Sequence, residues 1–225
     1  KKVSASAKNF GVFEYLPAYL AVALGAGETT LMRMVTGYAQ FVNGGKRITP
    51  TLIDRIQDRH GATIYKHDTR NCTDCGPRVA WEKQNVPNTP DNREQMNDPR
   101  TSYQIVSLLE GVVQRGTATG MKGVGRPVAG KTGTTNDYKD AWFIGFTPDL
   151  VIGTYVGFDE PRSLGEKETG GRIAVPIVKG FLSVALAGQP PVPFRMPEGI
   201  SLVRTNPMSG QRADPSDPQA IWEAF

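Results

Sequence analysis

The sequence lacks the long apolar run that would mark a membrane span. Its longest apolar stretch, residues 18–24, is far shorter than the ~20 residues needed to cross a bilayer. It also lacks a signal peptide and an initiator methionine, since it opens with Lys1-Lys2-Val3. The chain could therefore have lost its beginning, and the absence of a targeting segment excludes no cellular compartment.

No region of a single charge stands out either. The 225 residues carry 26 Lys and Arg against 22 Asp and Glu, a net charge of +4, and the two signs are interleaved. A nucleic-acid-binding surface is therefore not indicated, and we expect no nucleic-acid partner. What the chain does have is 39% apolar residues with 25 glycines and 17 prolines, which predicts a globular, loop-rich protein.

Hydrophobic spacing predicts helices and extended segments. Apolar residues recur at helical spacing in three segments, where Thr29 or Thr30 can cap the first and Pro176 is expected in the first turn of the last. Three strand-like runs lie between the second and third helices, and a Thr-Pro-Asp turn favours an antiparallel hairpin between the last two. We predict an α+β fold with helices layered on an antiparallel sheet. The expected helices are 28–42, 101–115 and 174–188, and the expected extended runs are 126–135, 140–148 and 150–158.

Three polar or proline-rich regions flank these elements. Residues 51–68 predict a hairpin around residues 58–61. Residues 69–100 are rich in Asn, Pro and Asp, and we predict a long surface insertion there. Residues 189–225 predict a proline-rich spacer and the start of a C-terminal appendage, in which residues 200–213 could form a small hairpin.

The stretch GRPVAGKTGTT, residues 125–135, has two interpretations. Gly125 to Thr132 satisfies the pattern of a nucleotide-binding P-loop, which needs a buried strand before its glycines and a helix after them. The lead-in to these glycines, MKGVGRP at residues 121–127, is instead glycine-rich and interrupted by Pro127, and the residues after the pattern lead into a strand-like run. The nucleotide interpretation therefore fails on its context.

The second interpretation is the lysine triad of the penicillin-recognising serine acyl-transferases, Lys131-Thr132-Gly133. A lysine on a strand supplies positive charge for an anionic substrate and for proton movement at a nucleophile. A glycine beside it lets a peptide or lactam lie against the strand edge, where the next backbone N–H can donate to a developing oxyanion.

A longer pattern resembles the C-terminal half of the transpeptidase domain of class A, bifunctional penicillin-binding proteins. The resemblance runs from about residue 10 to residue 187, so we assign residues 1–188 to this part of the domain. It implies a β-lactamase/transpeptidase-like fold and a D,D-transpeptidase that cross-links peptidoglycan stem peptides by serine acyl transfer, reacts with β-lactams and uses no cofactor. Four stretches carry it in order: LGAGETTLMRMVTGYAQFVNGGKRITPTLI, SLLEGVVQRGTA, GRPVAGKTGTTND and TGGRIAVPIVKGF.

The resemblance also implies which residues form the site. Thr134 is expected to offer its N–H to the oxyanion and its hydroxyl to the substrate carboxylate, and a glycine pair matches a family loop near the cleft. The expected residues are Lys131 as the catalytic lysine, with Thr132, Gly133, Thr134, Thr135, Gly170 and Gly171 binding the substrate or β-lactam.

The family's nucleophile is missing from this chain. No serine is followed by Lys three residues on or by Asn two residues on, and both family motifs lie upstream of the matching region. We therefore expect the chain to be the second half of a domain, inactive alone. The N-terminal half, with the serine and two of the family's five strands, is the expected partner and should pair a strand with residues 150–158.

For the parent protein, the resemblance implies a bacterial enzyme that also carries a glycosyltransferase. An N-terminal helix outside this chain would anchor it in the inner membrane, with this domain on the periplasmic side. The alternatives are a D,D-carboxypeptidase or β-lactamase of the same fold, and a non-catalytic penicillin-binding sensor domain.

The pair Cys72 and Cys75 lies in the polar insertion and outside the family motifs. It could form a local disulfide in an oxidising periplasm, bind zinc with His60 and His67, or remain two thiols. We assign it no metal and no catalytic role.

Overall fold

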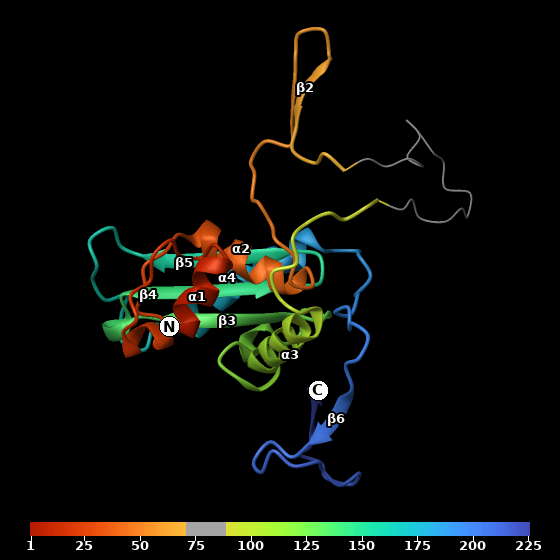
Figure 1. The fold of residues 1–225 in the computed structure, drawn as a ribbon. Coiled ribbons are helices and arrows are strands. Elements are labelled where there is room, and N and C mark those ends of the chain that lie inside the picture. Colours follow the sequence, from red (N-terminus) through yellow and green to blue (C-terminus); the bar gives the residue numbers. More distant parts are fainter. Residues whose placement is uncertain (71–88) are drawn as a thin grey trace.

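The computed structural model describes residues 1–70 and 89–225 (Figure 1). Its helices are α1 (Lys2–Asn9), α2 (Leu31–Val42), α3 (Pro99–Arg115) and α4 (Gly170–Ala185), with short 3-10 turns η1 (Leu20–Leu24), η2 (Thr119–Met121) and η3 (Asn136–Tyr138). Its strands are β1 (Arg55–Gln57), β2 (Thr63–Lys66), β3 (Ala129–Thr134), β4 (Asp140–Phe146), β5 (Val151–Gly157), β6 (Leu202–Thr205) and β7 (Ile221–Ala224). Cys72 and Cys75 lie outside the described residues, so the alternatives for this pair stay predictions.

An antiparallel sheet in the order β3-β4-β5 organises the body of the molecule. Helix α2 packs on one side of this sheet and α4 on the other, while α3 packs against β3 (Figure 1). We call these the α2 side and the α4 side. The α+β fold with helices layered on an antiparallel sheet is confirmed, as is the hairpin turn between the last two strands, where Thr147 N–H donates to the carbonyl of Leu150.

The helix starts follow the capping signals. The Thr30 hydroxyl accepts from the Arg33 N–H at the start of α2, as predicted. At the start of α3 the Asp98 carboxylate accepts from the Arg100 N–H, and Pro99 is the first helical residue. Helix α3 therefore begins at Pro99 rather than at residue 101, and it ends before Gly116 as predicted.

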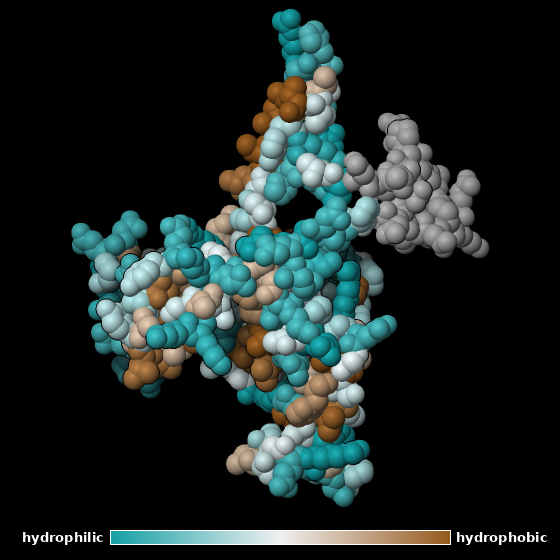
Figure 2. All heavy atoms as spheres, in the orientation of Figure 1, coloured by the Kyte–Doolittle hydropathy of each residue, from teal (hydrophilic) through white to brown (hydrophobic). Residues whose placement is uncertain are grey.

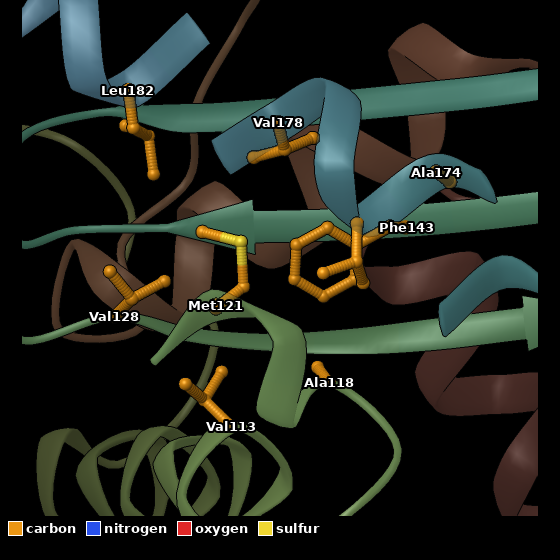
Figure 3. Close-up of a cluster of buried hydrophobic side chains, with 9 residues drawn as sticks. Val113, Ala118, Met121, Val128, Phe143, Ala174, Val178 and Leu182 are labelled. Atoms are coloured by element: carbon orange, nitrogen blue, oxygen red, sulfur yellow. The ribbon is translucent and has the colours of Figure 1, made fainter. Parts of the chain in front are cut away.

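Most of the core lies between the sheet and α4. Figure 3 shows Val178 and Leu182 reaching from α4 over the β-strands, with Phe143 of β4 and Met121 of η2 beside them. Phe143 has 0% exposure. A second cluster, on the α2 side, joins Val106, Ala129 and Phe146. The first cluster consists of Val113, Ala118, Met121, Val128, Phe143, Ala174, Val175, Val178 and Leu182.

Helix α4 begins earlier than predicted. It starts at Gly170 rather than at residue 174, so Pro176 lies inside the helix and not in its first turn. Proline at this position lacks the N–H that would donate to the carbonyl of Arg172. The prediction was wrong because two adjacent glycines disfavour a helix by propensity, whereas close packing against the sheet holds them in one here.

Two segments project from the body of the molecule: the β1–β2 arm and the C-terminal tail that carries β6 (Figure 1). The predicted hairpin within residues 51–68 is confirmed, because β1 and β2 pair antiparallel with Ile56 opposite Tyr65. Hydrophobic atoms gather along one edge of this arm in Figure 2. Within the part of the chain that the structure describes, no helix has the length and hydropathy to span a bilayer.

The C-terminal tail contains the predicted chain reversal within residues 200–213 and adds a strand pairing that was not predicted. Strand β6 pairs with β7, near the end of the chain, and within residues 200–213 an isolated bridge joins Thr205 to Arg212. The Arg115 guanidinium of α3 lies 2.9 Å from the Glu223 carboxylate of β7, which holds the tail against α3. Local turn signals could not reveal a partner strand so far along the sequence.

Candidate active site at strand β3

Strand β3 carries most of the predicted site residues and lies at an edge of the sheet. Side chains alternate between the two sides of a strand, and residues opposite each other on neighbouring strands share a side. Lys131 is opposite Ile144 and Gly133 is opposite Trp142, so these residues belong to the α2 side. Thr132, opposite Phe143, belongs to the α4 side.

Lys131 is exposed on the α2 side. Its Nζ donates to the backbone carbonyl of Thr132 at 2.8 Å. The ammonium group thus folds back along its own strand, where a hydrogen bond to a neighbouring carbonyl keeps the charge beside the strand edge.

Gly133 lies against an aromatic pair. A Cβ at this position would be 3.2 Å from the Cβ of Trp142, tighter than ordinary packing. The Trp142 ring packs against Tyr155 in a tilted arrangement, with 4.7 Å between centroids, and the Tyr155 hydroxyl donates to Asp140 Oδ1 at 2.8 Å. This hydrogen bond raises the pKa of Tyr155. On this part of β4, Trp142 thus lies with Tyr155 on the α2 side, while Phe143 belongs to the core.

The threonines of the α4 side are already engaged. The hydroxyls of Thr132 and Thr117 lie 2.6 Å apart, and Thr132 is buried. The Thr134 hydroxyl accepts from the Gly170 N–H at 3.0 Å. Thr117 was not among the predicted site residues. It lies in SLLEGVVQRGTA, one of the four stretches that carry the family resemblance, and this stretch could have indicated it.

The glycine pair lies behind the strand, in the first turn of α4 rather than in a loop. A Cβ on Gly170 would lie 2.4 Å from the carbonyl oxygens of Gly133 and Trp142, and one on Gly171 would lie 2.5 Å from the carbonyl oxygen of Thr117. Both positions therefore require glycine. They bring α4 close to β3 instead of facing the α2 side.

The turn from β3 to β4 is conformationally unusual. Asp137 and Tyr138 have φ values of 59° and 55°, the left-handed region that non-glycine residues seldom adopt. The Thr135 hydroxyl accepts from the Asp140 N–H at 2.8 Å, and the Tyr138 carbonyl accepts from the Leu164 N–H at 2.8 Å. These bonds hold the turn in place at the Thr134 end of the strand, and strained turns of this kind concentrate at functional sites.

A cavity of about 730 Å³ lies elsewhere, lined by residues of α2, α3 and the β4–β5 turn and by Phe194. None of the predicted site residues lines it. At its rim, hydrogen bonds from Arg93 and Lys46 hold the pKa of Asp91 well below its usual range. No cluster of three or more metal-ligand side chains occurs in the described ranges, and His60 lies in the turn of the β1–β2 arm.

Comparisons with known proteins agree on one family. The model of the penicillin binding protein transpeptidase domain matches residues 4–183. Penicillin-binding protein 1A of Rickettsia bellii is 42% identical over 219 residues, which are 97% of this chain and 27% of that protein. The protein of the same name from Neisseria flavescens is 44% identical over 186 residues, 82% of this chain and 21% of the relative.

The fold agrees as well. The crystal structure of penicillin-binding protein 1A from Haemophilus influenzae matches with a TM-score of 0.77 and 28% identity, over 97% of this chain and 35% of that one. The chain thus corresponds to about a quarter of the length of the curated relatives.

Proposed function

The chain belongs to the penicillin-binding protein transpeptidase domain family, and from this membership we propose that it carries the lysine strand of a serine-type D,D-transpeptidase. The longer protein would cross-link peptidoglycan stem peptides. The observation that carries the proposal is Lys131, exposed on an edge strand whose opposite side is held in the core.

The nucleophile in this proposal is a serine outside residues 1–225. Its Oγ attacks a carbonyl carbon of the donor stem peptide, the C–N bond breaks, and the leaving amine departs with the proton. The amine of a second stem peptide then attacks the ester, which forms the cross-link and restores the serine hydroxyl. A β-lactam stops at the acyl-serine, because its leaving amine stays tethered to the acyl group.

The strand supplies charge and hydrogen-bond donors to this reaction. Lys131 holds a positive charge beside the serine and the substrate carboxylate, where it favours proton transfer and anion binding. Gly133 leaves room for the peptide backbone along the strand. The Thr134 N–H donates to the oxyanion and its hydroxyl to the substrate carboxylate, with Thr135 beside it.

Three of the predicted binding residues take an indirect part in this proposal. Thr132 holds the strand through its contact with Thr117. Gly170 and Gly171 allow α4 to approach the strand from behind. They set the position of the cleft strand, while Lys131, Gly133 and Thr134 meet the substrate.

Two exposed surfaces support a partner that completes the domain. Strand β5 pairs with β4 alone among the described strands, so its outer edge is open to a further strand. Helix α4 is apolar on its outer face too, where Ile177, Phe181 and Val184 are 51%, 53% and 79% exposed at the spacing of a helix-packing stripe. We propose that the serine-bearing N-terminal half covers both surfaces.

The same proposal places the domain in the cell. A membrane anchor and a glycosyltransferase region belong to the longer protein, and the transpeptidase domain works on the periplasmic side of the bacterial inner membrane.

Acylation by a fluorescent penicillin tests this function. The longer protein should be labelled covalently and residues 1–225 alone should not, because they contain no Ser-x-x-Lys. Labelling of the isolated chain would contradict the assignment of the nucleophile. An assay with donor and acceptor stem peptides then separates the alternatives: a transpeptidase yields dimers, a D,D-carboxypeptidase yields hydrolysed stem peptide, and a sensor yields neither. A β-lactamase is recognised in the labelling experiment instead, because it hydrolyses the penicillin.

A further inference from the structure

Helix α4 is capped by the proposed cleft strand rather than by its own residues. Its N-cap residue, Thr169, makes no side-chain capping hydrogen bond. Instead, the N–H of Gly170 donates to Thr134 Oγ1 at 3.0 Å, across 36 positions of sequence. The first N–H groups of a helix have no partner within the helix, so Thr134 satisfies one of them.

This contact decides what the Thr134 hydroxyl can do. A threonine hydroxyl has one hydrogen and two lone pairs, and Gly170 occupies one lone pair from the α4 side. Thr134 is exposed, and the hydrogen bonds of the described residues include no acceptor for its hydroxyl hydrogen. The hydroxyl therefore has a free donor at the cleft strand, close to the positive end of the α4 dipole.

The contact depends on glycine at position 170. A Cβ there would lie 2.4 Å from two backbone carbonyl oxygens, those of Gly133 and Trp142, which cannot swing aside as a side chain can. Gly180, on the exposed face of the same helix, has nothing within 4 Å of the same position. The two glycines thus form a matched pair in which one is required by packing and the other is not.

We propose that Gly170 is a positioning residue for Thr134. Its N–H orients the Thr134 hydroxyl as a donor to the carboxylate that stem peptides and β-lactams share. The inference rests on the proposed function, and it concerns how an anionic ligand is selected rather than the acyl-transfer step itself.

The test compares Gly170→Ala with Gly180→Ala in the longer protein. The acylation rate constant is measured with a penicillin and with its methyl ester, which lacks the negative charge. Loss of a preorganised donor costs about 10²–10³ in rate, so misdirecting this one should slow the free acid by about 10-fold and the ester by less than about 2-fold. Gly180→Ala should change the acid and ester rates by the same factor, because Gly180 contacts neither Thr134 nor the strand.

Two results would overturn the proposal in this comparison. An equal loss for acid and ester would reduce Gly170 to a structural role, and unchanged rates would show that the contact is not needed. A double-mutant cycle combines Gly170→Ala with Thr134→Val. Because Gly170 acts through the hydroxyl, the double variant should be no slower than Thr134→Val alone, and additive losses would contradict the proposal.

Amide hydrogen exchange covers the case in which Gly170→Ala does not fold. The Gly170 N–H should exchange faster in Thr134→Val and keep its protection in Thr134→Ser, which retains the hydroxyl. Equal protection of the Gly170 N–H in both variants would show that it is not bonded to the Thr134 hydroxyl, which would overturn the proposal. If penicillin does not acylate the unsubstituted protein, the proposed function fails, while the exchange result still reports on Gly170 and Thr134.

Discussion

The two sides of the central sheet are covered to different extents near Gly133 and Trp142, although Ala129, Ile144 and Phe146 are buried on the α2 side further along the same strands. On the α4 side, Thr132, Ala141 and Phe143 are buried. On the α2 side, at positions adjacent to these, Lys131 is exposed and Trp142 is half-buried. Neighbouring residues of one strand therefore lie in different environments, because side chains alternate between the core and the side that is open to a ligand or a partner. Substitutions of the buried residues of these strands should therefore act mainly on stability, and substitutions of the exposed residues of β3 mainly on activity.

The largest effect is expected on the α4 side, at Phe143. Phe143→Ala should lower the free energy of unfolding by about 3–5 kcal/mol, because it opens a cavity in the main core. Urea denaturation of the 225-residue chain, followed by circular dichroism, measures the loss. Phe181→Ala is the matched control: the side chain is 53% exposed, and its removal should cost about 0.5 kcal/mol or less. Similar losses for both would remove the distinction between the covered and exposed surfaces.

On the α2 side, Lys131→Ala should leave stability almost unchanged and impair the reaction. Loss of one preorganised charged group should slow penicillin acylation of the longer protein by about 10²–10³-fold. Lys66→Ala, an exposed lysine on the β1–β2 arm, is the control and should acylate normally. A normal rate in Lys131→Ala would leave the triad as an ordinary piece of strand, whereas a large drop in stability would place Lys131 among the structural residues.

The sequence predicted the strands, the turn and the helix ends that depend on local sequence pattern. Alternation in DAWFIGF marked a strand, the turn at residues 147–149 joined it to the next strand, and Thr30 and Gly116 bounded their helices. Lys131 was identified by a triad embedded in a long resemblance. Each of these signals lies within a few residues of the feature it predicts.

What could not be predicted depends on contacts between distant segments. The start of α4 at Gly170, the pairing of β6 with β7 and the bond between Thr117 and Thr132 all join residues that are not adjacent in sequence or oppose local propensity. Alternation alone showed that Thr132 and Lys131 point apart. It did not show which side is covered, because that depends on where α2 and α4 pack.

A smaller effect is expected at Thr132, where the change removes a single hydrogen bond on the α4 side. Thr132→Val keeps the shape of the side chain but leaves the Thr117 hydroxyl without its partner, so stability should fall by about 1 kcal/mol. Thr132→Ser retains the hydroxyl and should recover most of the loss in urea denaturation. A Thr132→Val variant as stable as the parent would show that water replaces the bond without cost.

The smallest effect is expected from the equivalent deletion on the α2 side, Tyr155→Phe. The hydroxyl bonded to Asp140 belongs to an exposed side chain, so near neutral pH its loss should cost less than about 0.5 kcal/mol.

Because the hydrogen bond to Asp140 raises the Tyr155 pKa, the folded chain keeps this proton to higher pH than the unfolded chain does. The contribution is therefore present below pH ~10, the ordinary tyrosine pKa, and is lost as pH rises through the folded-state value. Urea midpoints of the parent and Tyr155→Phe should stay a constant distance apart up to pH ~10 and converge only as the pH rises above it, while Tyr65→Phe, on the exposed β1–β2 arm, should show no such convergence. Midpoints that diverge instead would mean that the Tyr155 hydroxyl stabilises the fold through its ionised form, and the bond to Asp140 would have to be discarded.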